Sequence, residues 1–482
     1  MHLFINMIFL INIVFIISII FIERRNPQTT WAWILILTFL PILGFIIYIL
    51  FGQNITREKN FKRKILDDKT KQKYLNSFKS HYKLDNISLK YKDLIMMNFN
   101  NDNSTYTQRN DIDLYFDANS LFEEMIDEIN KAEKFIHMEF YIFKSDEIGK
   151  KILQALTKKA KEGVEVKLLV DSIGNSIHKK DIDKLKAAGG DFKIFFPGFC
   201  KYINLRINYR NHRKILIIDS KVAFLGGFNI GDEYLGKDKN IGHWRDTHTK
   251  IKGLAINDLE GRFLLDWSYA NESDLDIDLK KYFINPHSTD LPKKIIGAQI
   301  VSSGPDHTEQ QIKNGYFKII NSAKKNLFIQ TPYFVPDEPM LEALRLAALS
   351  GVDVKIMLPG NPDHKFMGWI ANSYFESLLN AGAKIYLYEK GFLHAKTIVA
   401  DSSICSVGTA NMDIRSFSLN FESNIFIYNE AISKSMEEQF FKDLKVCTKV
   451  TLESFEKRSI ISRIGESIIR LVSPFNVEKY SV

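Results

Sequence analysis

Two stretches of the chain carry one set of polar residues at one spacing. In each, a lysine follows a histidine by two residues, an aspartate follows the lysine by five, and an asparagine follows the aspartate by ten. The residues are His212, Lys214, Asp219 and Asn229 in the first stretch, and His394, Lys396, Asp401 and Asn411 in the second. The chain has 11 histidines, and this spacing would match by chance roughly 0.1 times per chain. Two matches therefore indicate a paired functional site.

The residue types of this motif suit a target with negative oxygens. A neutral imidazole can act as a nucleophile or a base near neutral pH, and a lysine supplies a fixed positive charge. Residues two apart on a strand share a face, so each histidine is expected to point the same way as its lysine. The amides of Asn229 and Asn411 can donate to a phosphate oxygen, so a phosphodiester is the expected target. Asp219 and Asp401 come where each strand ends, at DSK and DSS, which favours a structural role in a turn over catalysis.

The elements that position these residues also occur twice. INKAEKFIHMEFYIF at residue 129 is similar to INSAKKNLFIQTPYFV at residue 320, and KEGVEVKLLVD at 161 to LSGVDVKIMLP at 349. Strands that alternate with helices in both copies predict a duplicated α/β domain with a mixed sheet flanked by helices. ILII at 215–218 and TIVA at 397–400 are apolar throughout, as in central strands covered on both faces. We place the domains at residues 106–290 and 291–482 and expect the sheets to pack side by side.

The first 51 residues predict a pair of transmembrane helices. Residues 2–22 and 31–51 contain no Asp, Glu, Lys or Arg, and each run has about the 20 residues that a helix needs to cross the hydrocarbon layer. A signal peptide followed by a buried core helix is disfavoured because the first run has no basic leader. Basic residues are dense from Arg57 to Lys71. The positive-inside rule therefore predicts a multi-pass protein of a cell membrane whose long remainder is cytoplasmic.

Basic residues also mark the less regular parts of the chain. Residues 52–105 are predicted to form a basic cytoplasmic tether with some helix, near anionic headgroups. Residues 457–472 place apolar and basic residues at helical spacing, which predicts a C-terminal amphipathic helix, either docked on the protein or lying on a membrane surface. The net charge of +8 suggests an acidic partner, which could be nucleic acid, an anionic membrane or a phosphorylated substrate.

The two HxKx4D motifs with GGFN and GTAN resemble the phospholipase D superfamily, and together with the N-terminal hairpin the chain resembles the bacterial cardiolipin synthases. The resemblance implies two tandem phospholipase D-like domains that each contribute half of one active site. It implies that His212 attacks phosphorus to form a phosphohistidine, while His394 protonates the leaving alkoxide and later deprotonates the accepting alcohol. The non-bridging oxygens would be held by Lys214, Lys396, Asn229 and Asn411.

In this superfamily a carboxylate usually orients each catalytic histidine. Glu422, in the run NFES, matches that position for His394, and Asp246, in HWRDTHTKIKG, is the candidate for His212. Such a group fixes the tautomer and the ring direction. No cluster of carboxylates or histidines stands at metal-ligand spacing, so we expect no metal and no cofactor.

The resemblance implies transfer of a phosphatidyl group from one phosphatidylglycerol to another, giving cardiolipin and glycerol, at an anionic membrane surface. A phospholipase D-type hydrolase or a phosphatidylserine synthase would use the same site with another acceptor. A superfamily nuclease also fits the positive charge. Two membrane spans and the lack of a basic run interleaved with aromatic residues argue against it, so no nucleic acid is expected. A non-catalytic scaffold would not need His, Lys and Asn in both copies.

Overall fold

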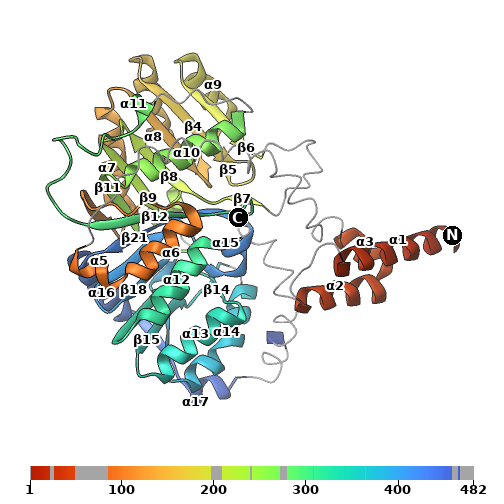
Figure 1. The fold of residues 1–482 in the computed structure, drawn as a ribbon. Coiled ribbons are helices and arrows are strands. Elements are labelled where there is room, and N and C mark those ends of the chain that lie inside the picture. Colours follow the sequence, from red (N-terminus) through yellow and green to blue (C-terminus); the bar gives the residue numbers. More distant parts are fainter. Residues whose placement is uncertain are drawn as a thin grey trace.

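The computed structural model describes residues 2–21, 27–48, 85–196, 209–238, 241–271, 279–307, 309–363, 365–458 and 465–466. Two β-sheets and their helices form two adjoining lobes, one from each copy of the repeat (Figure 1). The α/β class and the two domains with mixed sheets, as predicted from the sequence, are confirmed.

The first domain is built on a mixed sheet. Its strands are β1 (Asn110–Tyr115), β2 (Phe135–Phe140), β4 (Glu165–Asp171), β6 (Asp191–Phe195), β8 (Lys214–Ile218), β9 (Val222–Gly226) and β11 (His248–Gly253). They lie in the order β1–β11–β9–β8–β2–β4–β6, with β2, β4 and β6 parallel and the other pairings antiparallel. The helices are α7 (Ala118–Lys131), α8 (Glu147–Lys161), α9 (Lys179–Ala187) and α10 (Ile256–Asn271). β8 is central and wholly buried, as predicted.

The second domain repeats this plan. Its strands are β12 (Gly297–Ser303), β13 (Asn326–Gln330), β15 (Asp353–Pro359), β16 (Lys384–Tyr388), β18 (Thr397–Ala400), β19 (Ile404–Gly408), β21 (Asn420–Tyr428) and β22 (Cys447–Val450). They follow the order β12–β21–β19–β18–β13–β15–β16–β22. The helices are α12 (Gln311–Ser322), α13 (Glu338–Leu349), α14 (Lys365–Asn380) and α16 (Glu430–Leu444). β18 takes the place of β8 and is also fully buried.

The same local conformations recur in both copies because the same residues do. Gly163 after α8 and Gly351 after α13 both have φ of +88°, the left-handed helix end that favours glycine. The Asp-Ser pairs at 219–220 and 401–402 all have φ between 50° and 54°. Two consecutive residues in this region make the tight hairpin turn whose twist matches its strands. Each turn joins the strand that follows a motif histidine to the next strand of the sheet.

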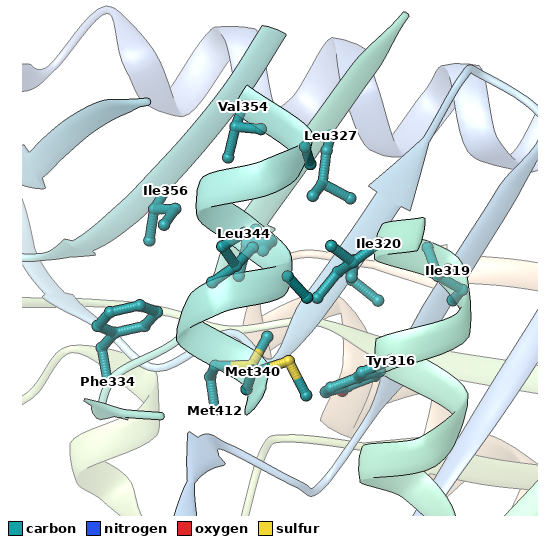
Figure 2. Close-up of a cluster of buried hydrophobic side chains, with 14 of the residues drawn as sticks. Tyr316, Ile319, Ile320, Leu327, Phe334, Met340, Leu344, Val354, Ile356 and Met412 are labelled. Atoms are coloured by element: carbon teal, nitrogen blue, oxygen red, sulfur yellow. The ribbon is translucent and has the colours of Figure 1, made fainter. Parts of the chain in front are cut away.

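Among the described residues, three large hydrophobic cores and one smaller cluster stabilise the two lobes. In the second domain α12 and α13 cover one face of the sheet, where Ile320 and Leu344 lie against Leu327 (Figure 2). Helices α7 and α8 cover the matching face of the first sheet. The third core contains side chains of both sheets, among them Ile215 of β8 and Val407 of β19. The sheets therefore pack side by side and hold the two motifs in fixed relation.

Part of the segment predicted as a tether belongs to the folded body. Helices α5 (Asn86–Lys90) and α6 (Lys92–Asp102) lie beside β12 and α12 (Figure 1). The side chains of Tyr91, Leu94 and Ile95 are buried in the core of the second domain. The prediction of a tether to residue 105 was wrong here, because these three apolar positions face one side of the helical segment. Residues 52–84 lie outside the described residues, as does the predicted C-terminal helix except for positions 457, 458, 465 and 466.

The two N-terminal apolar runs are helical, and the second is interrupted. After α1 (His2–Phe21), α2 (Pro27–Phe39) stops before Leu40 and α3 (Pro41–Ile47) begins at a proline, whose nitrogen cannot donate a helical hydrogen bond. The Asn12 side chain of α1 donates to the carbonyls of residues 37 and 41 at 3.2 Å and 2.9 Å, which joins the helices. Within the described ranges, no helix reaches the length and apolarity that crossing a membrane requires.

Candidate active site

Two short parallel strand pairings join the domains at the motifs. β7 (Arg210–Asn211) of the first domain pairs with the first residues of β21. β10 (His243–Arg245), also of the first domain, pairs with β17 (Gly391–Leu393) of the second. His212 directly follows β7 and His394 directly follows β17, so the two pairings bring both histidines to the domain interface.

The prediction that each histidine shares a strand with its lysine was wrong. His212 lies between β7 and β8, and His394 lies between β17 and β18. Each backbone N–H donates across the interface instead: that of His212 to the carbonyl of Phe421 at 2.9 Å, and that of His394 to the carbonyl of Arg245 at 2.7 Å. These bonds to the opposite domain take the histidine backbone out of its own sheet.

A buried carboxylate of the opposite domain contacts each histidine. Nδ1 of His212 lies 3.0 Å from both carboxylate oxygens of Glu422. Nδ1 of His394 lies 2.6 Å from Oδ2 of Asp246. Because an ionised carboxylate only accepts, Nδ1 carries the proton in both rings, and Nε2 is the nitrogen that remains for chemistry.

This arrangement corrects the pairing inferred from the sequence. Asp246 was assigned to His212 and Glu422 to His394, one pair within each half, and the structure exchanges the partners. The physical reason is the strand pairing between domains. β21 carries Glu422 beside β7, and β10 is followed by Asp246 beside β17.

An aromatic ring packs edge-on against each imidazole. The rings of Tyr141 and His212 lie 4.9 Å apart at an interplanar angle of 64°, and those of Trp244 and His394 lie 5.2 Å apart at 61°. Together with the carboxylate on Nδ1, this contact fixes the direction of each ring. The sequence analysis missed both aromatic residues, although Trp244 stands two residues before Asp246 and Tyr141 lies in the repeated strand segment.

The two motif lysines are buried beside their histidines. Nζ of Lys214 donates to the carbonyl of His212 at 2.7 Å, and Nζ of Lys396 donates to the carbonyl of His394. Burial lowers the pKa of Lys214 to about 7 and that of Lys396 to about 8, against the opposing effect of the nearby carboxylates. Each lysine therefore loses its charge at a lower pH than a solvated lysine does.

Burial also keeps both imidazoles neutral. It lowers the pKa of His212 to about 4 and that of His394 to about 3, and the adjacent lysines contribute to both decreases. For Asp246, burial raises the pKa, but the positive charge of Lys396 and the hydrogen bond to His394 outweigh it and the net shift is downward. At neutral pH the site thus contains two neutral imidazoles, which is the form a nitrogen nucleophile needs.

The histidines line one cavity of about 560 Å³ between the domains, and Asn229 and Asn411 line it as well. Neither motif lysine lines it. The Asn229 side chain already accepts from the Ile142 N–H at 3.1 Å and donates to the Tyr234 hydroxyl at 2.9 Å. One hydrogen of its amide group therefore remains for another acceptor.

The motif aspartates lie elsewhere and bind backbone. Asp219 accepts from three consecutive N–H groups, at residues 133–135, each at 2.8 Å. Asp401 accepts from the matching groups at residues 324–326, at 2.7 Å to 3.3 Å. Neither aspartate lines the cavity. Each carboxylate therefore holds backbone, as a structural role predicts, but in a neighbouring link and not in its own turn: Asp219 binds the link between α7 and β2, and Asp401 the link between α12 and β13.

Sequence reasoning also missed two residues that hold Glu422, one through its carboxylate and one through its backbone. Asn420 donates from Nδ2 to Oε1 of Glu422 at 3.2 Å. The buried Arg213 donates from Nε to the Glu422 carbonyl at 3.3 Å and to the Ser423 hydroxyl at 3.0 Å, and its Nη1 pairs with Asp266 of α10. A signal was present, since an arginine inside a buried motif requires anionic partners. Its partners could not be named without the fold.

Within the described part of the chain, one group of three carboxylates lies close enough together to suit a metal ion. Glu124, Asp127 and Glu128 lie together on α7, a cluster that the sequence analysis did not anticipate. Lys131 pairs with the last two, and Lys250 pairs with both glutamates. None of the three lines the cavity. Their charge is balanced by lysine, and they take no part in the site.

Comparisons with known proteins agree with this geometry. A family model described as "Cardiolipin synthase, PLD-like domain" matches residues 125–255 and 316–444, and one described as "Phospholipase_D-nuclease N-terminal" matches residues 10–53. The chain is 98% identical over 474 residues to a cardiolipin synthase of Clostridium perfringens (strain SM101 / Type A), covering 98% of this chain and 100% of that protein. It is 46% identical to the major cardiolipin synthase ClsA of Bacillus subtilis (strain 168), covering 94% of each.

A solved structure shares the fold. The phosphatidylserine synthase of Haemophilus influenzae Rd KW20 superposes with a TM-score of 0.60 at 15% identity, covering 82% of this chain and 99% of that one. At this identity the likeness concerns the fold alone. The family model, in contrast, matches both repeats, each with its histidine motif. The chain therefore belongs to the cardiolipin synthase family, the phosphatidyltransferases of phospholipase D type.

Proposed function

We propose that the enzyme transfers a phosphatidyl group from one phosphatidylglycerol to the hydroxyl of a second, releasing glycerol, with His212 and His394 as its catalytic residues. The observation that carries the proposal is the crossed arrangement of the two histidines. Both line one cavity, and the Nδ1 of each is held by a buried carboxylate of the opposite domain. Two equivalent imidazoles at one cavity suit two successive displacements at phosphorus.

In the first displacement Nε2 of His212 attacks phosphorus, and the bond from phosphorus to the headgroup glycerol breaks. Glu422 holds the Nδ1 proton, which keeps Nε2 unprotonated and stabilises the positive charge that develops on the ring. His394 donates a proton to the leaving glycerol oxygen. The bound phosphodiester raises the pKa of His394 because it places a negative charge beside the ring, so that His394 can act as an acid.

In the second displacement the hydroxyl of another phosphatidylglycerol attacks the phosphohistidine. His394, now neutral, takes the proton of that hydroxyl while the phosphorus–nitrogen bond breaks and returns the electron pair to His212. Asn229 and Asn411, which line the cavity, donate to the non-bridging oxygens. When the substrate binds, the ammonium groups of Lys214 and Lys396 leave the histidine carbonyls and donate to phosphate oxygens. There they balance the negative charge that develops on these oxygens in both steps.

The lysines give the reaction a specific pH dependence. Burial sets the pKa of Lys214 to about 7 and that of Lys396 to about 8 in the free enzyme, and each is charged below its pKa. We expect kcat/KM to fall as pH rises above 7 if binding requires Lys214 and above 8 if it requires Lys396, by about tenfold per unit for each required lysine whose pKa has been passed. The initial rate at a low concentration of phosphatidylglycerol, recorded from pH 5 to pH 10, measures this dependence of kcat/KM. A kcat/KM that stays constant to pH 10 would exclude cationic lysines from substrate binding.

The direct test of the proposed function is lipid analysis after the purified protein is incubated with vesicles of pure phosphatidylglycerol in the presence of a chelator. Cardiolipin and glycerol in equal amounts are expected, since the proposed residues supply every proton and positive charge. Phosphatidic acid as the main product would make water the acceptor at the same site. No conversion by folded protein would reject the function.

The N-terminal helices are proposed to anchor the enzyme in the cell membrane as a hairpin within residues 1–51, with the catalytic domains, 106–290 and 291–482, in the cytoplasm. The charge-free runs and the basic residues that follow them support this. We limit the tether to residues 52–84, because α5 and α6 are packed on the second domain. A C-terminal reporter that is accessible only from outside the cell would contradict the orientation.

A further inference from the structure

The mouth of the active-site cavity carries apolar side chains from both domains. Ile173, in the connection after β4, lines the cavity and is 43% exposed. In the second domain Met367 of α14 lines the cavity and also an adjoining hollow. Trp369, two residues further along this helix, lines that adjoining hollow and is 46% exposed. Large apolar side chains exposed beside a binding site suit a surface that another apolar phase covers.

The position of Ile173 is fixed by the catalytic machinery. Asp171, at the end of β4, is buried, and its Oδ1 accepts from the Ile173 N–H at 2.9 Å. Its other oxygen, Oδ2, accepts at 2.9 Å from the N–H of Asn211, the residue before His212. One buried carboxylate therefore holds both the exposed isoleucine and the segment that carries the proposed nucleophile. These hydrogen bonds fix the position of the exposed Ile173 side chain relative to the site.

Trp369 is equally fixed. The neighbouring side chain of Ile370 and, further along α14, that of Phe375 are packed in the core of the second domain. This packing sets the rotation of α14 and leaves Trp369 on its outer face. α14 follows the end of β15, the strand edge at which the cavity lies. Its first turns therefore stand at the same edge of the sheet as the catalytic groups.

The size of the cavity limits how a diacyl lipid can enter it. A volume of about 560 Å³ is in the range that encloses one molecule of drug size. The reaction requires two diacyl lipids to meet at His212 and His394. Their headgroups can enter the cavity, but their four acyl chains exceed it and must stay in an apolar phase outside. The apolar phase that holds the acyl chains must therefore reach the rim of the cavity.

We propose that the mouth of the cavity rests directly on the lipid bilayer, with Ile173 and Trp369 immersed in its interfacial region as two anchors, one from each domain. This inference rests on the proposed function, since the bilayer is the phase that holds the acyl chains. Tryptophan favours this region because its ring is apolar with one polar edge. Two lysines that line the cavity, Lys144 and Lys237, are paired with acidic residues of the same domain, so the exposed apolar side chains and not these cations carry the contact.

The first experiment compares two forms of one substrate. The full-length Ile173→Ser/Trp369→Ser variant is reconstituted in vesicles, and cardiolipin formation is measured from long-chain phosphatidylglycerol in the bilayer. It is also measured from dihexanoyl phosphatidylglycerol added below its micelle-forming concentration. We expect the bilayer reaction to fall at least about tenfold and the monomer reaction to stay within about twofold. Unchanged bilayer activity, or an equal loss with both substrates, would overturn the proposal.

A control variant tests the location of the effect. Leu349 is 60% exposed at the last residue of α13, at the edge of the sheet away from the cavity. Leu349→Ser removes a comparable exposed side chain and is expected to leave both activities unchanged. A loss of bilayer activity in this variant equal to that of the double variant would show a general effect of surface apolarity and reject a specific mouth contact.

The second experiment needs no catalysis, so it separates this inference from the proposed function. The fluorescence of the wild-type protein minus that of Trp369→Phe isolates the Trp369 signal, which is recorded in vesicles with and without brominated acyl chains. Strong quenching is expected. A tryptophan placed at position 349 in the Trp369→Phe background should not be quenched. Absence of quenching at Trp369 would overturn the docking, whereas quenching without cardiolipin formation would reject the function and keep the membrane contact.

Discussion

Alanine at position 212 is expected to lower cardiolipin formation by at least about 10³-fold, because it removes the nucleophile that divides the transfer into two displacements. Alanine at position 394 should cause a loss of the same order with the natural lipid, since the proton transfers of both steps then lack their acid and base. Steady-state rates therefore do not distinguish the two residues. A substrate whose leaving group needs no proton does distinguish the two residues.

A p-nitrophenyl ester of phosphatidic acid provides that distinction, because p-nitrophenolate leaves without a proton. His394→Ala is expected to release one equivalent of phenolate per site in a rapid burst and then to stall as the phosphohistidine. His212→Ala should give no burst. The matched control is His137→Ala, which removes a buried histidine that pairs with Glu260 at 2.7 Å and does not line the cavity. A burst in His212→Ala and none in His394→Ala would reverse the two roles.

The second large effect concerns the carboxylates. Glu422→Gln and Asp246→Asn should each lower the rate about 10²–10⁴-fold, because an amide can present an N–H to Nδ1 and so force the wrong tautomer of the ring. The volume changes little, so the fold should remain. The size of the loss does not test the crossed pairing, but the step that is lost does.

With the p-nitrophenyl ester, Glu422→Gln should slow the burst itself, since Glu422 contacts His212. Asp246→Asn should keep the burst and slow only the turnover that follows, since Asp246 contacts His394. Pairing within each half would give the opposite result. Glu260→Gln is the matched control, a buried carboxylate–histidine pair outside the cavity, and its specific activity should stay near that of the wild type.

The crossed carboxylates also explain why a single domain is an incomplete site. The first domain carries His212 and Asp246, and the second carries His394 and Glu422. Each ring is oriented only when the opposite domain is packed against it. Arg213 strengthens this dependence because its guanidinium contacts the backbone of Glu422 in one domain and the carboxylate of Asp266 in the other. The interface between the domains thus sets the geometry of both proposed catalytic groups.

Much of this protein can be predicted from the sequence, wherever the information is local or repeated. The spacing of His212, Lys214 and Asn229 and its repeat identified the site and the duplication, because short motifs keep their residues close whatever the fold. The apolar runs of β8 and β18 identified central strands, because burial on both faces requires apolar residues at both parities. The aspartates at 219 and 401 were predicted to have a structural role in their own turns, and each accepts backbone hydrogen bonds, although from the neighbouring link between a helix and a strand.

What the sequence left undecided, or assigned wrongly, depends on contacts between distant segments. The histidines lie beside strands of the opposite domain, α5 and α6 are packed on the second domain, and Tyr141 and Trp244 lie against the catalytic rings. The partners of Asp246 and Glu422 were exchanged for the same reason. Chain spacing determined which residue types meet at this site, whereas the packing of two sheets on one shared core decided which carboxylate meets which histidine, because strand pairing across an interface has no record in local sequence.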